Sequence, residues 1–69
     1  MTIDVLIRTM RTRAGLSVRE LANEIGVVNQ SVYNWESGSR IPSAEMLLAV
    51  AQACDHELLF RPKHRFYDK

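Results

Sequence analysis

The stretch from residue 17 to residue 38 reads SVRELANEIGVVNQSVYNWESG and predicts two short helices joined by a tight turn. Ser17 and Glu20 have the spacing of a capping box, in which each side chain accepts a hydrogen bond from a backbone amide at a helix start. Gly26 ends the first of these helices, because glycine adopts the positive φ of a tight interhelical turn without steric cost. The second helix ends at Gly38 in the same way.

Two further helices are predicted on either side of this pair. The first is indicated by apolar residues at helical spacing, namely Ile3, Leu6, Ile7 and Met10. Gly15 follows it and favours a left-handed end. Ser43 has the chemistry of an N-cap for a last helix, from about Ala44 to Cys54. Short helices joined by tight turns predict an all-α fold with a central helix-turn-helix.

The composition is that of one small globular domain. The chain has 69 residues, of which 46% are hydrophobic and 25% charged, and its net charge is +1. We expect a single domain over residues 1–69, with a helical core at about 3–54 and a C-terminal strand or tail at 55–69. The sequence contains no long apolar run and no signal peptide, so we expect no membrane partner and a cytoplasmic, nucleoid-associated location.

The predicted last helix is apolar on most of its sides, and a chain of this length has little other material with which to bury it. We therefore expect a homodimer. Apolar and polar residues alternate loosely after this helix and favour a short strand, which would pair with its counterpart in a second copy because a helical chain offers no other partner. The expected interface residues are Met46, Ala49, Ala53, Leu58 and Phe60.

These features together resemble the lambda-repressor-like DNA-binding domain of the Cro and xenobiotic-response-element type. The matching residues are Gly15-Leu16-Ser17, Glu20-Leu21-Ala22, Ile25-Gly26-Val27, Trp35-Glu36-Ser37-Gly38 and Pro42-Ser43. The resemblance covers about residues 3 to 54. It implies a compact all-α domain of four to five helices, and a sequence-specific transcriptional regulator that binds double-stranded DNA without a cofactor.

The third predicted helix would enter the major groove in this motif. Helical geometry directs Val32 and Trp35 inward and leaves a polar face outward. That face carries the expected base contacts, namely Asn29, Gln30, Tyr33 and Asn34. Asparagine and glutamine can each bond bidentately to adenine, and tyrosine can touch a thymine methyl group or a phosphate.

Phosphate contacts are expected on both sides of this helix. The candidates are the amides near Ser17 and Val18, the side chain of Arg19, and Ser37, Ser39 and Arg40. A helix N-terminus attracts phosphate through its free amides and its dipole. The basic tail offers a further phosphate contact, or it is simply a solvated terminus.

The sequence departs from the family pattern at two positions. Val18 stands where the family commonly has a glutamine that contacts DNA, so that contact is absent. Val28 stands where a serine or threonine usually caps the third helix, and valine cannot accept the amide hydrogen bond. As an alternative, Asn29 caps this helix one residue later, which would remove Asn29 from base reading.

Arg11 and Glu36 lie near the apolar stripes of their helices although both are charged. The resemblance implies that they form a partly buried ion pair that links the first helix to the end of the third. Its role would be to fix geometry, because breaking a buried pair costs more than forming it gains. The alternative is two solvated charges with no mutual contact.

Other classes of function fit the sequence less well. An enzyme is not expected, because one cysteine, two histidines and no paired carboxylates in a credible cleft leave nothing with which to build a catalytic site. Metal binding by Cys54, His56 and His64 matches no common zinc spacing, and Cys54 is better explained as a core residue. The open alternative to a phage-type repressor is an antitoxin that binds both its operator and a toxin protein. A third class, a protein-interaction adaptor, does not explain the polar face and Arg40.

Overall fold

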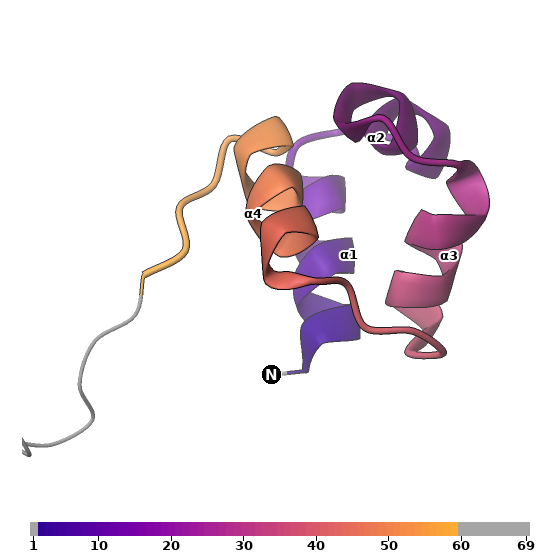
Figure 1. Cartoon of the computed structure of the whole chain (residues 1–69). Helices are drawn as coiled ribbons and strands as arrows, with labels where there is room; N and C mark the ends of the chain where they lie inside the picture. Colours follow the sequence, from indigo (N-terminus) through magenta and orange to yellow (C-terminus); the bar gives the residue numbers. More distant parts are fainter. Residues whose placement is uncertain (1, 60–69) are drawn as a thin grey trace, which may run out of the picture.

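The computed structural model describes residues 2–59, which form four helices (Figure 1). These are α1 (Ile3–Arg13), α2 (Val18–Ile25), α3 (Asn29–Ser37) and α4 (Ala44–Ala53). Both α1 and α2 contact α3 and α4, and Figure 1 shows α3 and α4 on either side of α1. The predicted all-α fold with a central helix-turn-helix is confirmed, and α2 and α3 are its two helices.

One core holds the four helices together. It is built from residues that are at most 7% exposed: Ile7, Met10, Leu21, Ala22, Val32, Trp35, Val50, Ala51 and Cys54. Every helix contributes to it, so the angle between α2 and α3 is fixed by packing on α1 and α4. Ala22 is fully buried on α2, which contacts α3 directly. A small side chain allows two helix backbones to approach closely at such a contact.

The start of α2 is fixed by side chains of its own first turn. Ser17 Oγ accepts from the Glu20 amide at 3.0 Å, and Glu20 Oε1 accepts from the Ser17 amide at 2.8 Å. At the other end Gly26 has φ +76°, a left-handed conformation in which an L side chain would be strained. The predicted capping box and the glycine turn are therefore both present.

The start of α3 is different. Val28 is its N-cap, in extended conformation, and makes no side-chain hydrogen bond to the helix. Asn29 is the first helical residue, so the alternative in which Asn29 caps α3 is wrong. Ser31 N donates to Val28 O at 3.0 Å, which means that the chain turns into the helix at valine without a capping side chain. Asn29 is exposed and stays available for contacts outside the chain.

The segment after α4 corrects the predicted strand. Residues 56–59 form neither helix nor strand. His56 N donates to Ala51 O at 2.8 Å at the end of α4, and the described residues contain no strand with which this segment could pair. Leu58 instead packs partly against the core, while Leu59 is 82% exposed. Phe60 and the basic tail lie outside the described residues. None of the helices in residues 2–59 has the length and apolarity needed to cross a membrane.

Candidate nucleic-acid interface

The outward face of α3 carries the polar residues that the sequence assigned to it. Asn29, Gln30 and Tyr33 are exposed, and Asn34 is half-buried at the edge of the same face. Val32 on the opposite face is fully buried. With Val32 and Trp35 anchored in the core, α3 cannot rotate without unpacking it. The four side chains therefore project from a helix of fixed orientation.

Hydrogen bonds connect part of this face to the loop that follows α3. Gln30 Nε2 donates to Asn34 Oδ1 at 2.9 Å. Ser37 Oγ donates to Asn34 O at 3.1 Å, and the hydroxyls of Ser37 and Ser39 are 3.0 Å apart. Arg40 N donates to the same Asn34 carbonyl at 3.2 Å. Asn34 is thus the α3 residue to which both Ser37 and Arg40 are hydrogen-bonded, and Gly38 N also donates to Trp35 O at 3.4 Å.

Arg11 and Glu36 form a bidentate ion pair that joins α1 to the end of α3. Arg11 Nε donates to Glu36 Oε2 at 2.6 Å and Arg11 Nη2 donates to Glu36 Oε1 at 2.9 Å. Arg11 Nη1 also donates to the Leu16 carbonyl at 2.9 Å. The hydrogen bonds that Arg11 donates to Glu36 raise the pKa of Arg11, so this guanidinium stays charged. The Glu36 side chain is 7% exposed, and the Arg11 guanidinium supplies the opposite charge beside it.

Arg8 is a member of this cluster that the sequence interpretation missed. Its Nη2 donates to the Glu36 backbone carbonyl at 3.1 Å, and its Nε lies 3.6 Å from Glu36 Oε1. The Arg8 side chain remains 60% exposed. Its position one helical turn before Arg11 was the available signal, since residues three apart share a helix face.

The comparisons with known proteins identify the family. The helix-turn-helix family model HTH_3, of the Cro/C1 type, matches residues 7–58, which is more than half of the chain. The chain belongs to the HTH_3 family. A search of curated proteins gives no significant match. Membership makes this chain a DNA-binding transcriptional regulator of a non-enzymatic class.

The predicted phosphate contacts of this HTH_3 domain fall into two groups. Arg19 and Arg40 are exposed, whereas Ser17 uses both its hydroxyl and its amide in the capping box. The first i to i−4 bond of α2 is donated by Leu21 to Ser17 O at 3.0 Å, so the Val18 and Arg19 amides have no intrahelical acceptor. The Ser37 hydroxyl is within hydrogen-bond distance of the Asn34 backbone carbonyl and of the Ser39 hydroxyl. The side chains of the two arginines are therefore the better placed of these groups.

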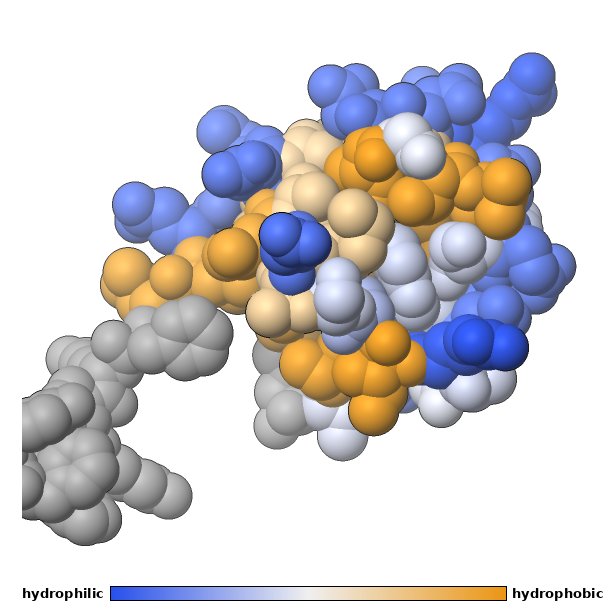
Figure 2. Space-filling model, in the orientation of Figure 1, coloured by the Kyte–Doolittle hydropathy of each residue, from blue (hydrophilic) through white to orange (hydrophobic). Residues whose placement is uncertain are grey.

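The predicted dimer residues on α4 are used partly inside the chain. Met46, Ala49 and Ala53 are half-buried, and Met46 and Ala53 pack against the core. Figure 2 shows weakly apolar side chains gathered over α4. Beside them Glu24 and Ile25 of α2, with Ala49, Gln52 and Ala53, line a shallow hollow. Leu58 is half-buried and lies close to this helix in sequence.

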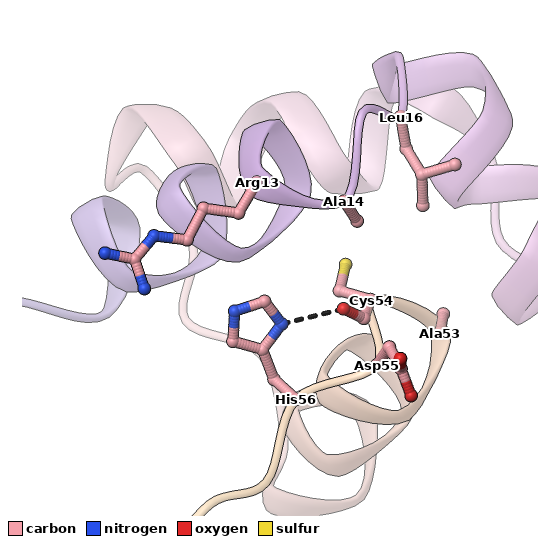
Figure 3. Close-up of a pocket in the computed structure, with 7 residues that line it drawn as sticks. All are labelled: Arg13, Ala14, Leu16, Ala53, Cys54, Asp55 and His56. Atoms are coloured by element: carbon pink, nitrogen blue, oxygen red, sulfur yellow. Dashed lines mark hydrogen bonds between the residues drawn. The ribbon is translucent and has the colours of Figure 1, made fainter.

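A second hollow lies between the ends of α1 and α4 (Figure 3). The Cys54 thiol points into it toward Ala14 and Leu16, and burial raises the pKa of this thiol. His56 Nδ1 is 2.7 Å from the Cys54 carbonyl oxygen. Cys54 is 2% exposed and is a core residue, as the sequence indicated. Within residues 2–59 no group of three His, Cys, Asp or Glu residues could hold a metal.

Proposed function

We propose that the chain is a dimeric repressor that inserts α3 into the major groove of a palindromic operator. The observation that supports this most directly is the polar outward face of α3, held in place by the Arg11–Glu36 pair and by the buried Trp35. An α-helix fits the major groove of B-DNA, where each base pair presents a distinct pattern of donors and acceptors that amide side chains can contact. Asn29, Gln30, Tyr33 and Asn34 are the proposed base contacts.

The proposed backbone contacts lie on both sides of that face. Arg40 is exposed and lines a shallow groove along α3 together with Gln30 and Asn34. Arg19 is exposed in the first turn of α2. Because guanidinium groups bind phosphate without reading sequence, these residues would place the domain on the duplex and α3 would choose the site.

Selection of bound duplexes from random DNA tests this function. A repressor of this kind selects a palindrome whose half-sites are separated by a whole number of helical turns. Gln30→Ala should then relax the preference at one base pair per half-site. Arg40→Ala should weaken binding to all sequences and lower the salt slope by about one. Equal losses on every sequence for Gln30→Ala would contradict base reading by α3.

Dimer formation is proposed from the half-buried apolar residues of α4 and from Leu58. Sedimentation of the whole chain at tens of micromolar should give a dimer, and a monomer at that concentration would contradict it. Ala49→Glu should shift the chain toward monomer, because a charge would enter the apolar surface of α4. Glu45→Lys is a suitable control, since Glu45 is exposed in the first turn of the same helix.

An antitoxin is the second candidate function, in which the same domain also binds a toxin protein. Its support is Leu59, which is 82% exposed and precedes a basic segment. Co-purification of the chain with one stoichiometric protein partner, lost in Leu59→Asp, would favour it. A homodimer that binds its operator and co-purifies with no other protein would favour the stand-alone repressor.

A further inference from the structure

We infer that Gln30 and Asn34 read DNA as one coupled unit, and that Ser39 is a positioning residue that sets the hydrogen-bonding pattern of that unit. The inference rests on the proposed DNA contacts of α3 and adds what each side chain can recognise. The sequence alone treats the two amides as independent readers, each able to bond bidentately to adenine. The hydrogen bonds on this face make that equivalence wrong.

The carbonyl oxygen of the Asn34 side chain is already occupied. Gln30 Nε2 donates to Asn34 Oδ1 at 2.9 Å, and Ser39 Oγ donates to the same atom at 3.4 Å. A bidentate contact to adenine needs this oxygen to accept from the N6 amino group while the amide nitrogen donates to N7. Asn34 therefore offers DNA the donors of Nδ2 and no acceptor.

Gln30 keeps both kinds of group. Its Nε2 carries two protons, of which one is donated to Asn34. Its Oε1 accepts no hydrogen bond from the described residues. Gln30 can thus accept from N6 and donate to N7 of adenine, whereas Asn34 pairs only with a base that presents acceptors. In the major groove guanine presents the acceptors N7 and O6 and thymine presents O4, whereas adenine presents N7 beside the N6 donor, which would meet no acceptor on Asn34.

Ser39 is the loop residue that contacts the side-chain oxygen of Asn34. Each hydroxyl has one proton. When Ser37 donates its proton to Ser39 Oγ, 3.0 Å away, the Ser39 proton is left for Asn34 Oδ1, and Arg40 N donates to the Asn34 backbone carbonyl. The Ser39 hydroxyl also lies 3.0 Å from that of Ser37 and 3.3 Å from Asn34 O, so it is held between the two. A hydroxyl that donates to Asn34 is a poor phosphate ligand. Ser39 therefore positions a base reader, and its assignment as a phosphate contact is replaced.

The benefit to binding is preorganisation. Asn34 is half-buried and is fixed before DNA arrives, so its rotamers need not be frozen in the complex. These hydrogen bonds are weak in water, because water competes for each donor and acceptor. Exclusion of water by the groove strengthens them. The coupling should thus be detectable in the free protein and larger on DNA.

The test measures base preference and salt dependence together, using the whole chain and duplexes carrying the selected half-site. All four bases are placed at the two positions read by Gln30 and Asn34, and affinity is measured over a range of salt. Wild type should prefer adenine at one position and guanine or thymine at the other. Ser39→Ala should reduce the second preference by about fivefold and admit adenine there. Its salt slope should be unchanged.

Two variants make this result specific. Ser39→Thr keeps the hydroxyl and should restore the preference. Arg40→Ala should lower the salt slope by about one and leave the order of bases intact. Circular dichroism of each variant verifies that α3 is folded. In the free protein, side-chain amide resonances of Asn34 should shift in Ser39→Ala and return in Ser39→Thr.

Each other outcome overturns the inference. A lower salt slope with an unchanged base order in Ser39→Ala would make Ser39 a phosphate contact. An adenine preference at the Asn34 position in wild type would show that Oδ1 is free to accept. Unchanged Asn34 resonances in Ser39→Ala would remove the positioning role without reference to DNA. A wild-type chain that selects no sequence would overturn the proposed function as well, which distinguishes the two failures.

Discussion

The two helices of the helix-turn-helix unit are held in opposite ways. α2 is secured at its start by local chemistry, since Ser17 and Glu20 satisfy amides of the same turn. α3 begins at Val28 with no capping side chain and is secured at its end, where Glu36 pairs with Arg11 of another helix. Local capping stabilises the start of α2 without contacts from other helices. Tertiary anchoring fixes the orientation of α3 and leaves its first turn open.

Loss of the ion pair that anchors α3 should lower the free energy of unfolding more than loss of the α2 cap. Glu36→Ala leaves Arg11 in a site where its side chain is only 16% exposed, with no carboxylate to balance it. Removing one partner of a buried pair costs about 3 kcal/mol, because the remaining charge stays desolvated. Urea unfolding followed by circular dichroism measures this free energy. Arg8→Ala is the matched control, and it should cost well under 1 kcal/mol because that side chain is 60% exposed.

A loss for Glu36→Ala as small as that of the Arg8 control would mean that α3 is not anchored by the ion pair. The double variant Arg11→Ala, Glu36→Ala sharpens the point. Removing both charges should recover part of the loss, since no unpaired charge is then buried. A double variant as unstable as the sum of the two single variants would contradict direct coupling between these side chains.

Loss of the local cap of α2 should lower the free energy of unfolding by a smaller amount that can still be measured. Ser17→Ala removes the oxygen that accepts from the Glu20 amide and should lower the free energy of unfolding by about 1 kcal/mol. The same urea experiment measures it. Arg19→Ala is the control in the same turn, because Arg19 is exposed and takes no part in the cap. Equal losses of stability in Ser17→Ala and Arg19→Ala would mean that the cap does not stabilise α2.

The contrast between the helices also separates what sequence predicts from what it does not. The capping box and Gly26 were predictable because both depend on neighbours within a few residues. The core was predictable from helical spacing, which placed Ile7, Val32 and Trp35 inward. Each of these features follows from local geometry, so no knowledge of the tertiary arrangement was needed.

The remaining features depend on segments that meet only in the folded chain. The contact of Arg8 with Glu36 joins residues 28 apart. Helical spacing places Arg8 and Arg11 on one face of α1, but it does not show which segment that face meets. The bond from Ser39 to Asn34 depends on how the loop folds back over α3. The strand favoured after α4 failed for a related reason. Alternation alone cannot supply the neighbouring strand that residues 56–59 would need.

Because the start of α3 has no capping side chain, one substitution there should raise the stability of the domain. Val28→Ser should raise the free energy of unfolding by roughly 0.5 kcal/mol, because serine at the N-cap can accept from an amide of the first turn. Val28 is 68% exposed, so little apolar burial is lost. Val28→Ala is the control that removes the same methyl groups without adding an acceptor. A serine variant no more stable than the alanine variant would mean that the first turn of α3 needs no cap.

The smallest effect should appear in acid, and of the two helices of the helix-turn-helix unit it should appear only at α2. Hydrogen bonds from the Ser17 amide and hydroxyl lower the pKa of Glu20 below its ordinary value. A carboxyl with a lowered pKa in the folded chain contributes stability above its unfolded pKa and loses it as pH falls through the folded pKa. The α3 helix has no acidic residue in its first turn, so no such loss arises there.

Wild type should therefore lose more stability than Glu20→Gln between about pH 5 and pH 3, since glutamine keeps a neutral acceptor. Thermal unfolding of both chains across this range measures the difference. Parallel curves would mean that the Glu20 charge contributes nothing to the start of α2.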